Sequence, residues 1–83
     1  MYYVYVLWSV TDKKFYIGYT ADLERRIKEH SRQAVYSTSR FKSAKLVFYE
    51  AFSLEEDARR RERYFKTTKG KKALRLMLQR TIQ

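Results

Sequence analysis

The chain has 83 residues, enough for one small domain, and its 19 lysines and arginines against 9 acidic residues give a formal net charge of +10 at pH 7. Apolar residues reach 45%, too many for a disordered basic tail, and the absence of cysteine excludes a disulfide framework, a thiolate zinc site and a cysteine nucleophile. The sequence has no apolar run long enough to span a membrane and no signal peptide, so we expect a cytoplasmic protein whose partner is polyanionic, with nucleic acid first.

The beginning of the chain predicts a β-hairpin. Residues 2–8 are rich in aromatic and β-branched side chains, which is typical of a strand buried on both faces. A polar turn over residues 9–14 leads to a second strand over residues 15–19, and so short a connection makes the two strands antiparallel. Tyr5 and Tyr16 lie on the two arms of the hairpin. If the turn has an even number of residues, both side chains point to the same face of the sheet.

A helix is predicted over residues 22–31. Asp22 is placed to be its N-cap or a first-turn acid, and Leu23 and Ile27, one turn apart, are expected to face the core. Two basic residues with the same spacing share a face beside that apolar stripe: Arg26 and His30.

The middle of the chain predicts a basic loop and a third strand. Residues 31–45 contain four lysines or arginines and no acid, and we expect a loop there with a short helix near residues 34–39. Residues 45–52 alternate in the manner of a strand.

A helix then runs from Ser53 to about Lys66. Ser53 with Glu56 three residues later has the form of a capping box, which predicts Ser53 as the N-cap. The apolar stripe of this helix consists of Leu54, Ala58 and Phe65.

A last helix is predicted over about residues 69–80, with Thr67 or Thr68 as its cap. Its apolar residues are Leu74, Leu76, Met77 and Leu78. The element order β-β-α-β-α-α indicates a single α+β domain over residues 1–83, with a three-stranded antiparallel sheet flanked by helices.

One carboxylate stands out because it falls on an apolar stripe. Glu62 comes four residues after Ala58 and three before Phe65, so it points toward the core side of its helix. Such a carboxylate is costly unless it is paired or binds a metal. Two interpretations stay open: an ion pair with an arginine such as Arg59 or Arg26, and a metal ligand at the floor of a basic cleft.

A family signature joins these residues. Two half-motifs lie on the predicted hairpin, Tyr3-Val4-Tyr5 and Tyr16-Ile17-Gly18, and Tyr16 comes eleven positions after Tyr5. Arg26 and His30 follow on the first helix, and Glu62 comes on a later one. In this order and spacing, over nearly the whole chain, the sequence resembles the GIY-YIG nuclease superfamily. The second half-motif is intact, whereas the first begins with tyrosine where the family has glycine.

The resemblance implies a metal-dependent DNA endonuclease with a small α/β fold. It assigns Glu62 to a single divalent metal, magnesium or manganese, and Arg26 to a non-bridging phosphate oxygen. It favours Tyr5 as the base that activates water, supported by Tyr16 and His30, while the order of the two tyrosines stays open. We expect little sequence specificity, a preference for DNA structure or single strands, and a role in repair, recombination or DNA processing.

Affinity is expected to come from a basic surface, because residues 54–83 hold ten basic side chains and four acids. The residues predicted to contact nucleic acid are Tyr19, Arg25, Arg32, Tyr36, Arg40, Lys42, Arg59 and Lys66, with Tyr64 as a further stacking candidate. Two alternatives remain: a catalytically weak nucleic-acid-binding module, and a nuclease subunit that needs a protein partner.

Overall fold

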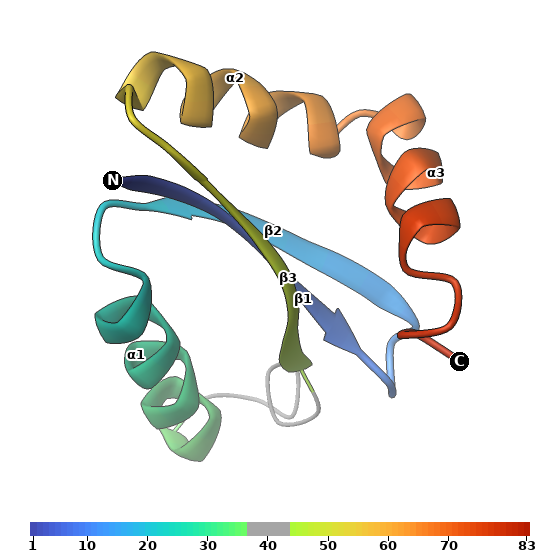
Figure 1. Ribbon diagram of the computed structural model, residues 1–83. Helices are drawn as coiled ribbons and strands as arrows, with labels where there is room; N and C mark the ends of the chain where they lie inside the picture. The colour runs from blue at the N-terminus through green and yellow to red at the C-terminus, as the bar shows by residue number, and fades with distance from the viewer. Residues whose placement is uncertain (37–43) are drawn as a thin grey trace.

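A computed structural model describes residues 1–36 and 44–83, with the backbone alone described for residues 31–36 (Figure 1). The elements in chain order are β1 (Tyr2–Ser9), β2 (Lys14–Thr20), α1 (Leu23–Tyr36), β3 (Ala44–Phe52), α2 (Glu55–Phe65) and α3 (Thr68–Met77). This order confirms the predicted α+β fold class. Within the described stretches, no helix is long and apolar enough to cross a membrane.

The sheet is antiparallel throughout, with the strand order β2-β1-β3. β1 lies in the centre, where Tyr5 pairs with Gly18 on β2 and with Tyr49 on β3. Residues 4–9 of β1 are buried, which confirms a strand covered on both faces. β2 and β3 are the edge strands, so in the described sheet each keeps one edge without a strand partner.

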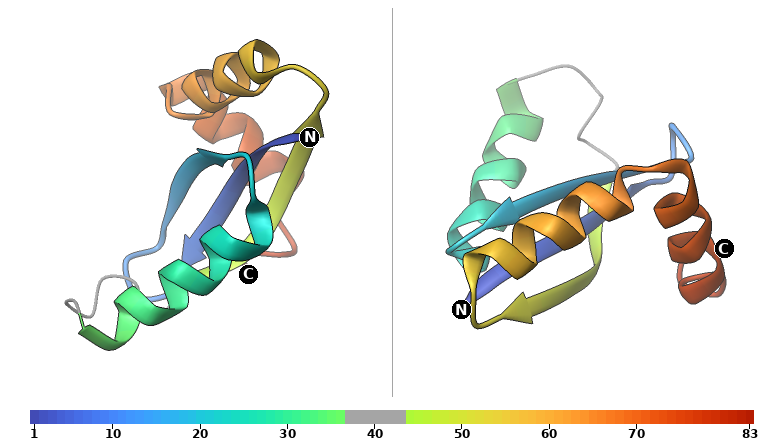
Figure 2. Two further views of the ribbon diagram at one scale, coloured as in Figure 1. Left: turned by 90° about the vertical axis from the view of Figure 1, so that its left-hand side faces the viewer. Right: turned by 90° about the horizontal axis from the view of Figure 1, so that it is seen from above.

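The two faces of the sheet carry different helices (Figure 2). Because strand side chains alternate, β1 sends Val4, Val6 and Trp8 to one face and Tyr3, Tyr5 and Leu7 to the other. The first face forms the core, together with buried residues of α2, of α3 and of the C-cap of α3: Ala58, Phe65, Leu74 and Leu78. On the second face, half-buried Leu23 and Ile27 of α1 border a groove with side chains of β1 and β3.

The start of α1 follows the prediction and its end does not. Asp22 is the N-cap, since its Oδ1 accepts from the backbone N–H of Arg25 at 3.1 Å. The helix continues to Tyr36, so residues 31–36 are helical rather than part of a loop. Nothing in this segment breaks a helix, because it contains neither glycine nor proline. The rest of the predicted short helix lies outside the described residues.

The capping box predicted at Ser53 is wrong. Leu54 is the N-cap of α2, with extended backbone angles and no side-chain cap, and the hydroxyl of Ser53 points to the sulfur of Met1 at 4.0 Å. Three acids in the first turn stabilise this end through the helix dipole: Glu55, Glu56 and Asp57. Leu54 is 63% exposed, because it precedes the helix and does not share its apolar stripe.

The last helix is shorter than predicted and tightly joined to α2. Thr67 caps it by accepting from the backbone N–H of Gly70 at 3.0 Å, as predicted, but α3 ends at Met77. A Cβ on Gly70 would come within 2.0 Å of the carbonyl oxygen of Tyr64, so glycine is needed where α3 meets the end of α2. Of the four apolar residues predicted there, two are buried and two, Leu76 and Met77, are exposed.

Candidate active site

The site begins with a tyrosine that crosses a glycine. Tyr5 lies on the central strand and is 4% exposed. A Cβ built on Gly18, its partner on β2, would stand 2.3 Å from the Tyr5 hydroxyl oxygen. The missing side chain therefore leaves the space through which the Tyr5 ring reaches toward the outer edge of the sheet.

Two residues of α1 meet the hydroxyl group of Tyr5. Arg26 Nε donates to Tyr5 Oη at 3.1 Å, and His30 Nε2 lies 3.1 Å from the same oxygen. The ring centroids of Tyr5 and His30 are 5.7 Å apart in an edge-to-face arrangement. The spacing of four residues between Arg26 and His30 places both side chains on the same side of α1, as the sequence predicted.

The electrostatics of this group favour a neutral imidazole. Burial and then the neighbouring charge of Arg26 lower the pKa of His30, while Glu29 acts weakly in the opposite direction. A neutral Nε2 without a proton can accept from the hydroxyl of Tyr5. The pKa of Arg26 is raised, first by its hydrogen bond to Tyr5, so the guanidinium stays charged.

Glu62 reaches the same region from α2. Its side chain is 17% exposed, and its Oε2 lies 3.1 Å from the Nζ of Lys66, one turn later. The predicted arginine partners are wrong, because Arg59 pairs with Glu55, and Arg26 bonds Tyr5 and Glu29. Sequence periodicity located the carboxylate correctly and misidentified its cation.

All five residues predicted as catalytic line one pocket of about 310 Å³. The complete lining is Tyr5, Leu7, Tyr16, Ile17, Gly18, Tyr19, Arg26, His30, Glu62 and Lys66. Residues 16–19 point alternately to the two faces of β2, yet all of them border the pocket. The pocket therefore wraps around the open edge of β2, with α1 on one side and α2 on the other.

Tyr16 lines the pocket but bonds elsewhere. Its hydroxyl donates to Asp12 Oδ2 at 2.8 Å, in the turn between β1 and β2. Sequence reasoning did not identify Asp12, since an aspartate in a polar turn is ordinary and carries no signal of its own.

The donors of the pocket suit a metal that needs few protein ligands. Among the described residues, no three histidine, cysteine or acidic side chains cluster closely enough to hold an ion together. Glu62 is the carboxylate of the pocket, half-buried and directed into it. One carboxylate fits magnesium, which retains several waters and takes substrate phosphate as a ligand.

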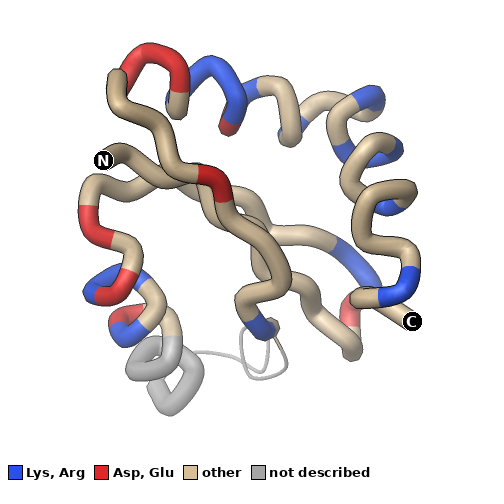
Figure 3. Tube along the Cα trace, viewed as in Figure 1, with Lys and Arg blue, Asp and Glu red and all other residues tan. Residues whose placement is uncertain are grey.

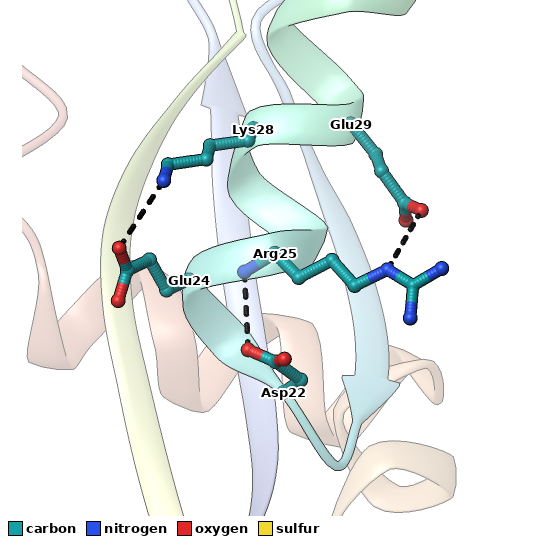
Figure 4. Close-up of a pocket in the computed structure, with 5 residues that line it drawn as sticks. All are labelled: Asp22, Glu24, Arg25, Lys28 and Glu29. Carbon is teal, nitrogen blue, oxygen red and sulfur yellow. Dashed lines mark hydrogen bonds and ion pairs between the residues drawn. The ribbon is translucent and has the colours of Figure 1, made fainter.

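A second pocket, of about 450 Å³, lies at the start of α1 (Figure 4). Its carboxylates are already engaged: Glu24 with Lys28 at 3.3 Å, Glu29 with Arg25 at 3.5 Å, and Asp22 as the helix cap. Arg25, predicted to contact nucleic acid, lies in this pocket of mixed charge rather than in the first one.

The remaining residues predicted to bind nucleic acid are distributed unevenly. Tyr19 packs between elements of the protein: Tyr2 stacks on it at 6.5 Å, Arg59 lies 4.2 Å from its ring, and its hydroxyl donates to Glu55 at 2.9 Å. Desolvation and then the bond to Glu55 raise the pKa of Tyr19, and the same bond lowers the pKa of Glu55. Tyr64 is 39% exposed. Outside the described side chains lie Arg32, Tyr36, Arg40 and Lys42.

Comparison with known proteins identifies the family. The family model of the GIY-YIG catalytic domain matches residues 1–75. The chain belongs to the GIY-YIG family. As a GIY-YIG domain it has a nuclease-type function, and the predicted resemblance is confirmed.

Small bacterial proteins are similar to this GIY-YIG domain. The UPF0213 protein CPE1444 of Clostridium perfringens is 34% identical over 84 residues, which cover 100% of this chain and 89% of the relative. The UPF0213 protein SH2523 of Staphylococcus haemolyticus is 35% identical over 81 residues, with coverages of 95% and 96%. The UPF0213 protein YazA of Bacillus subtilis is 40% identical over 63 residues, with coverages of 74% and 63%. No solved structure matches the chain.

Proposed function

We propose that this GIY-YIG domain is a divalent-metal-dependent endonuclease that hydrolyses phosphodiester bonds in DNA. The observation that carries the proposal is the convergence of Tyr5, Arg26, His30 and Glu62 on one pocket at the open edge of β2. These side chains supply a proton acceptor, a cation and a carboxylate, which phosphodiester hydrolysis requires.

Tyr5 and His30 move the proton. As Tyr5 Oη accepts a proton from the attacking water, its own phenolic proton passes to His30 Nε2, 3.1 Å away. The resulting hydroxide forms the new bond to phosphorus, and the bond to the leaving sugar oxygen breaks. The lowered pKa of His30 keeps the imidazole ready to accept a proton at neutral pH.

Arg26 stabilises charge on the phosphate. Its guanidinium carries five N–H donors, of which one goes to Tyr5 and one to Glu29. The remaining donors are available to a non-bridging phosphate oxygen, where negative charge grows during the reaction. The bond to Tyr5 also fixes the position of the guanidinium beside the proton acceptor.

Glu62 is the residue that would hold magnesium or manganese. When bound, such an ion acts as a Lewis acid on the phosphate and stabilises the leaving oxygen. A metal on Glu62 would compete with Lys66, whose Nζ lies 3.1 Å from Oε2 of this carboxylate, and the ammonium would then be available to the nucleic-acid backbone.

We further propose little sequence specificity, with DNA structure or single strands preferred and specificity in the cell supplied by a protein partner. Support comes from the cationic side chains around the pocket, Arg26 and Lys66, because contacts to phosphate carry no sequence information. Such an activity suits repair, recombination or DNA processing.

The test is a cleavage panel at low salt with single-stranded, duplex, flap and four-way DNA, each with magnesium, manganese or EDTA. Glu62→Gln should lower metal-dependent cleavage at least about 100-fold, since the Lewis acid supplies several kcal/mol. Glu56→Gln, the same change at an exposed position of the same helix, is the control and should cleave normally. If every substrate is bound but none is cleaved, and Glu62→Gln does not change the binding, the nuclease proposal is wrong and a nucleic-acid-binding module is indicated.

A further inference from the structure

The basic residues of the described chain fall into two groups. Seven ion pairs engage cations of α1, of α2 and of the C-cap of α2, namely Arg25, Arg26, Lys28, Arg59, Arg60, Arg61 and Lys66. In contrast, α3 has four basic residues and no acid. Figure 3 shows the difference as mixed red and blue on α1 and α2, and blue without red on α3.

A second set of cations connects α3 to the pocket through the β1–β2 hairpin. Lys14 lies two residues before Tyr16 on the same face of β2, and its Nζ is 5.4 Å from the centroid of the Tyr16 ring. Tyr16 lines the pocket, so Lys14 lies next to a pocket residue without lining the pocket itself. Lys13 precedes it at the turn, in the left-handed region with a φ of 55°, and is exposed.

Arg75 links the hairpin to α3. Its Nη2 donates to the carbonyl oxygen of Lys13 at 3.5 Å, and its guanidinium lies 5.6 Å from the ring of Trp8 and 5.7 Å from that of Phe15. Lys71 is exposed one turn earlier on the same side of α3. We call Lys13, Lys14, Lys71 and Arg75 the hairpin track.

The positive charges of the hairpin track are not used in ion pairs within the described part of the protein. In the part of the chain that the structure describes, none of its four cations lies within ion-pair distance of a carboxylate. The acid of the same turn, Asp12, accepts the hydroxyl of Tyr16. A phosphate that binds here displaces counterions and breaks no ion pair within the protein.

We propose that the DNA strand held in the pocket continues along the hairpin track, from Lys14 over the β1–β2 turn to α3. This inference rests on the proposed function, because the strand is the substrate of the same pocket. The three residue-to-residue steps from Tyr16 to Lys13 span about 10 Å at about 3.3 Å per step. That length matches about three base steps of duplex at about 3.4 Å each, so substrate contacts extend several nucleotides to one side of the cut.

The test compares two double variants of the full chain that remove equal charge. Lys13→Gln/Lys14→Gln alters the track, and Lys28→Gln/Arg60→Gln alters exposed cations that pair with Glu24 and Asp57. Binding of a short labelled DNA is followed by fluorescence anisotropy in EDTA, from about 50 to about 200 mM salt. The track variant should lower the slope of log affinity against log salt by about 2 and weaken binding at least about tenfold near 0.1 M, and the control should lower it by less than half as much.

Lys71→Gln extends the test to α3 and should lower the slope by about 1 more. Equal slopes for the track variant and the control would overturn the hairpin track, while metal-dependent cleavage by the wild type would leave the proposed function standing. A selective loss of slope without cleavage by the wild type would support the track and refute the nuclease. Circular dichroism of each variant checks that the fold is retained, which is expected because the substituted side chains are exposed.

Discussion

At the scale of single residues, Tyr5 connects the central strand to α1. Its hydroxyl oxygen is 3.1 Å from both Arg26 Nε and His30 Nε2, and its ring occupies the space over Gly18. The sheet fixes the ring and the helix fixes its two partners, so the proposed proton acceptor is oriented before substrate binds. Such preorganisation avoids the cost of ordering the site during the reaction.

The protonation of His30 can be followed directly by NMR, because His30 is the single histidine of the chain. We expect its proton NMR titration to have a midpoint below the usual value of about 6.5. Arg26→Gln should raise the midpoint, since it removes a positive charge that disfavours the imidazolium. Arg25→Gln is the control and should move the midpoint less. A midpoint at or above about 6.5 in the wild type contradicts this electrostatic account.

The same shift sets the sign of a pH effect on stability. The folded state favours neutral His30, so the unfolded chain binds more protons between the lowered pKa of the folded state and the ordinary pKa of about 6.5. The contribution of His30 to stability is therefore present above that pH and decreases as the pH falls from there toward the lowered pKa of the folded state.

At the scale of elements, the ends of the helices position the site. Asp22 fixes the start of α1, one turn before Arg26, and Thr67 fixes the start of α3 directly after Lys66. The close contact of Gly70 with the carbonyl of Tyr64 sets the corner between α2 and α3. The corner thus holds Glu62 and the basic face of α3 in a constant relation.

The contributions of Thr67 and Ser53 to the free energy of unfolding can be compared by denaturation. Thr67→Ala should lower the free energy of unfolding by about 1 kcal/mol, because the N–H of Gly70 loses its acceptor. Ser53→Ala should change it by less than about 0.5 kcal/mol, since Ser53 does not cap α2. Urea titrations of both variants and the wild type measure the difference. A larger loss for Ser53→Ala than for Thr67→Ala would refute this assignment of the helix ends.

At the scale of the whole molecule, repulsion among the excess positive charges destabilises the compact folded state. The whole chain carries a net charge of +10, and the principal extents of the structure are 33 × 27 × 19 Å. At about 10 mM salt the Debye length is about 30 Å, so charges on opposite sides repel each other, whereas at about 0.15 M it falls to about 8 Å. Ion pairs on α1 and α2 reduce the repulsion locally, whereas the positive charges of the proposed hairpin track are not reduced in this way.

Salt should therefore stabilise the free protein. We expect the melting temperature to rise by several degrees between about 10 and about 150 mM sodium chloride, as screening weakens the self-repulsion. Differential scanning calorimetry without nucleic acid measures it, and a neutral osmolyte at equal osmolality is the control. A melting temperature that falls with salt would mean that the intramolecular ion pairs outweigh the excess positive charge.

Several features could be predicted from the sequence because they depend on near neighbours. The apolar run at residues 2–8, the short polar turn after it, and the caps at Asp22 and Thr67 are read locally, and each was confirmed. The helical period alone placed Glu62 on the inner side of α2. The prediction of Ser53 as the N-cap was wrong because a capping pattern does not fix the residue at which the helix begins.

The sequence by itself determined the order of elements, the family and the residue types of the site, because periodicity and motif spacing are properties of the chain. The tertiary structure alone decided how these residues meet. Lys66 as the partner of Glu62, Asp12 as the acceptor of Tyr16, and Arg75 at the hairpin depend on strand register and on the packing of helices against the sheet. The position of the Tyr5 ring over Gly18 also depends on strand register, and it places the Tyr5 hydroxyl in the pocket at the edge of β2.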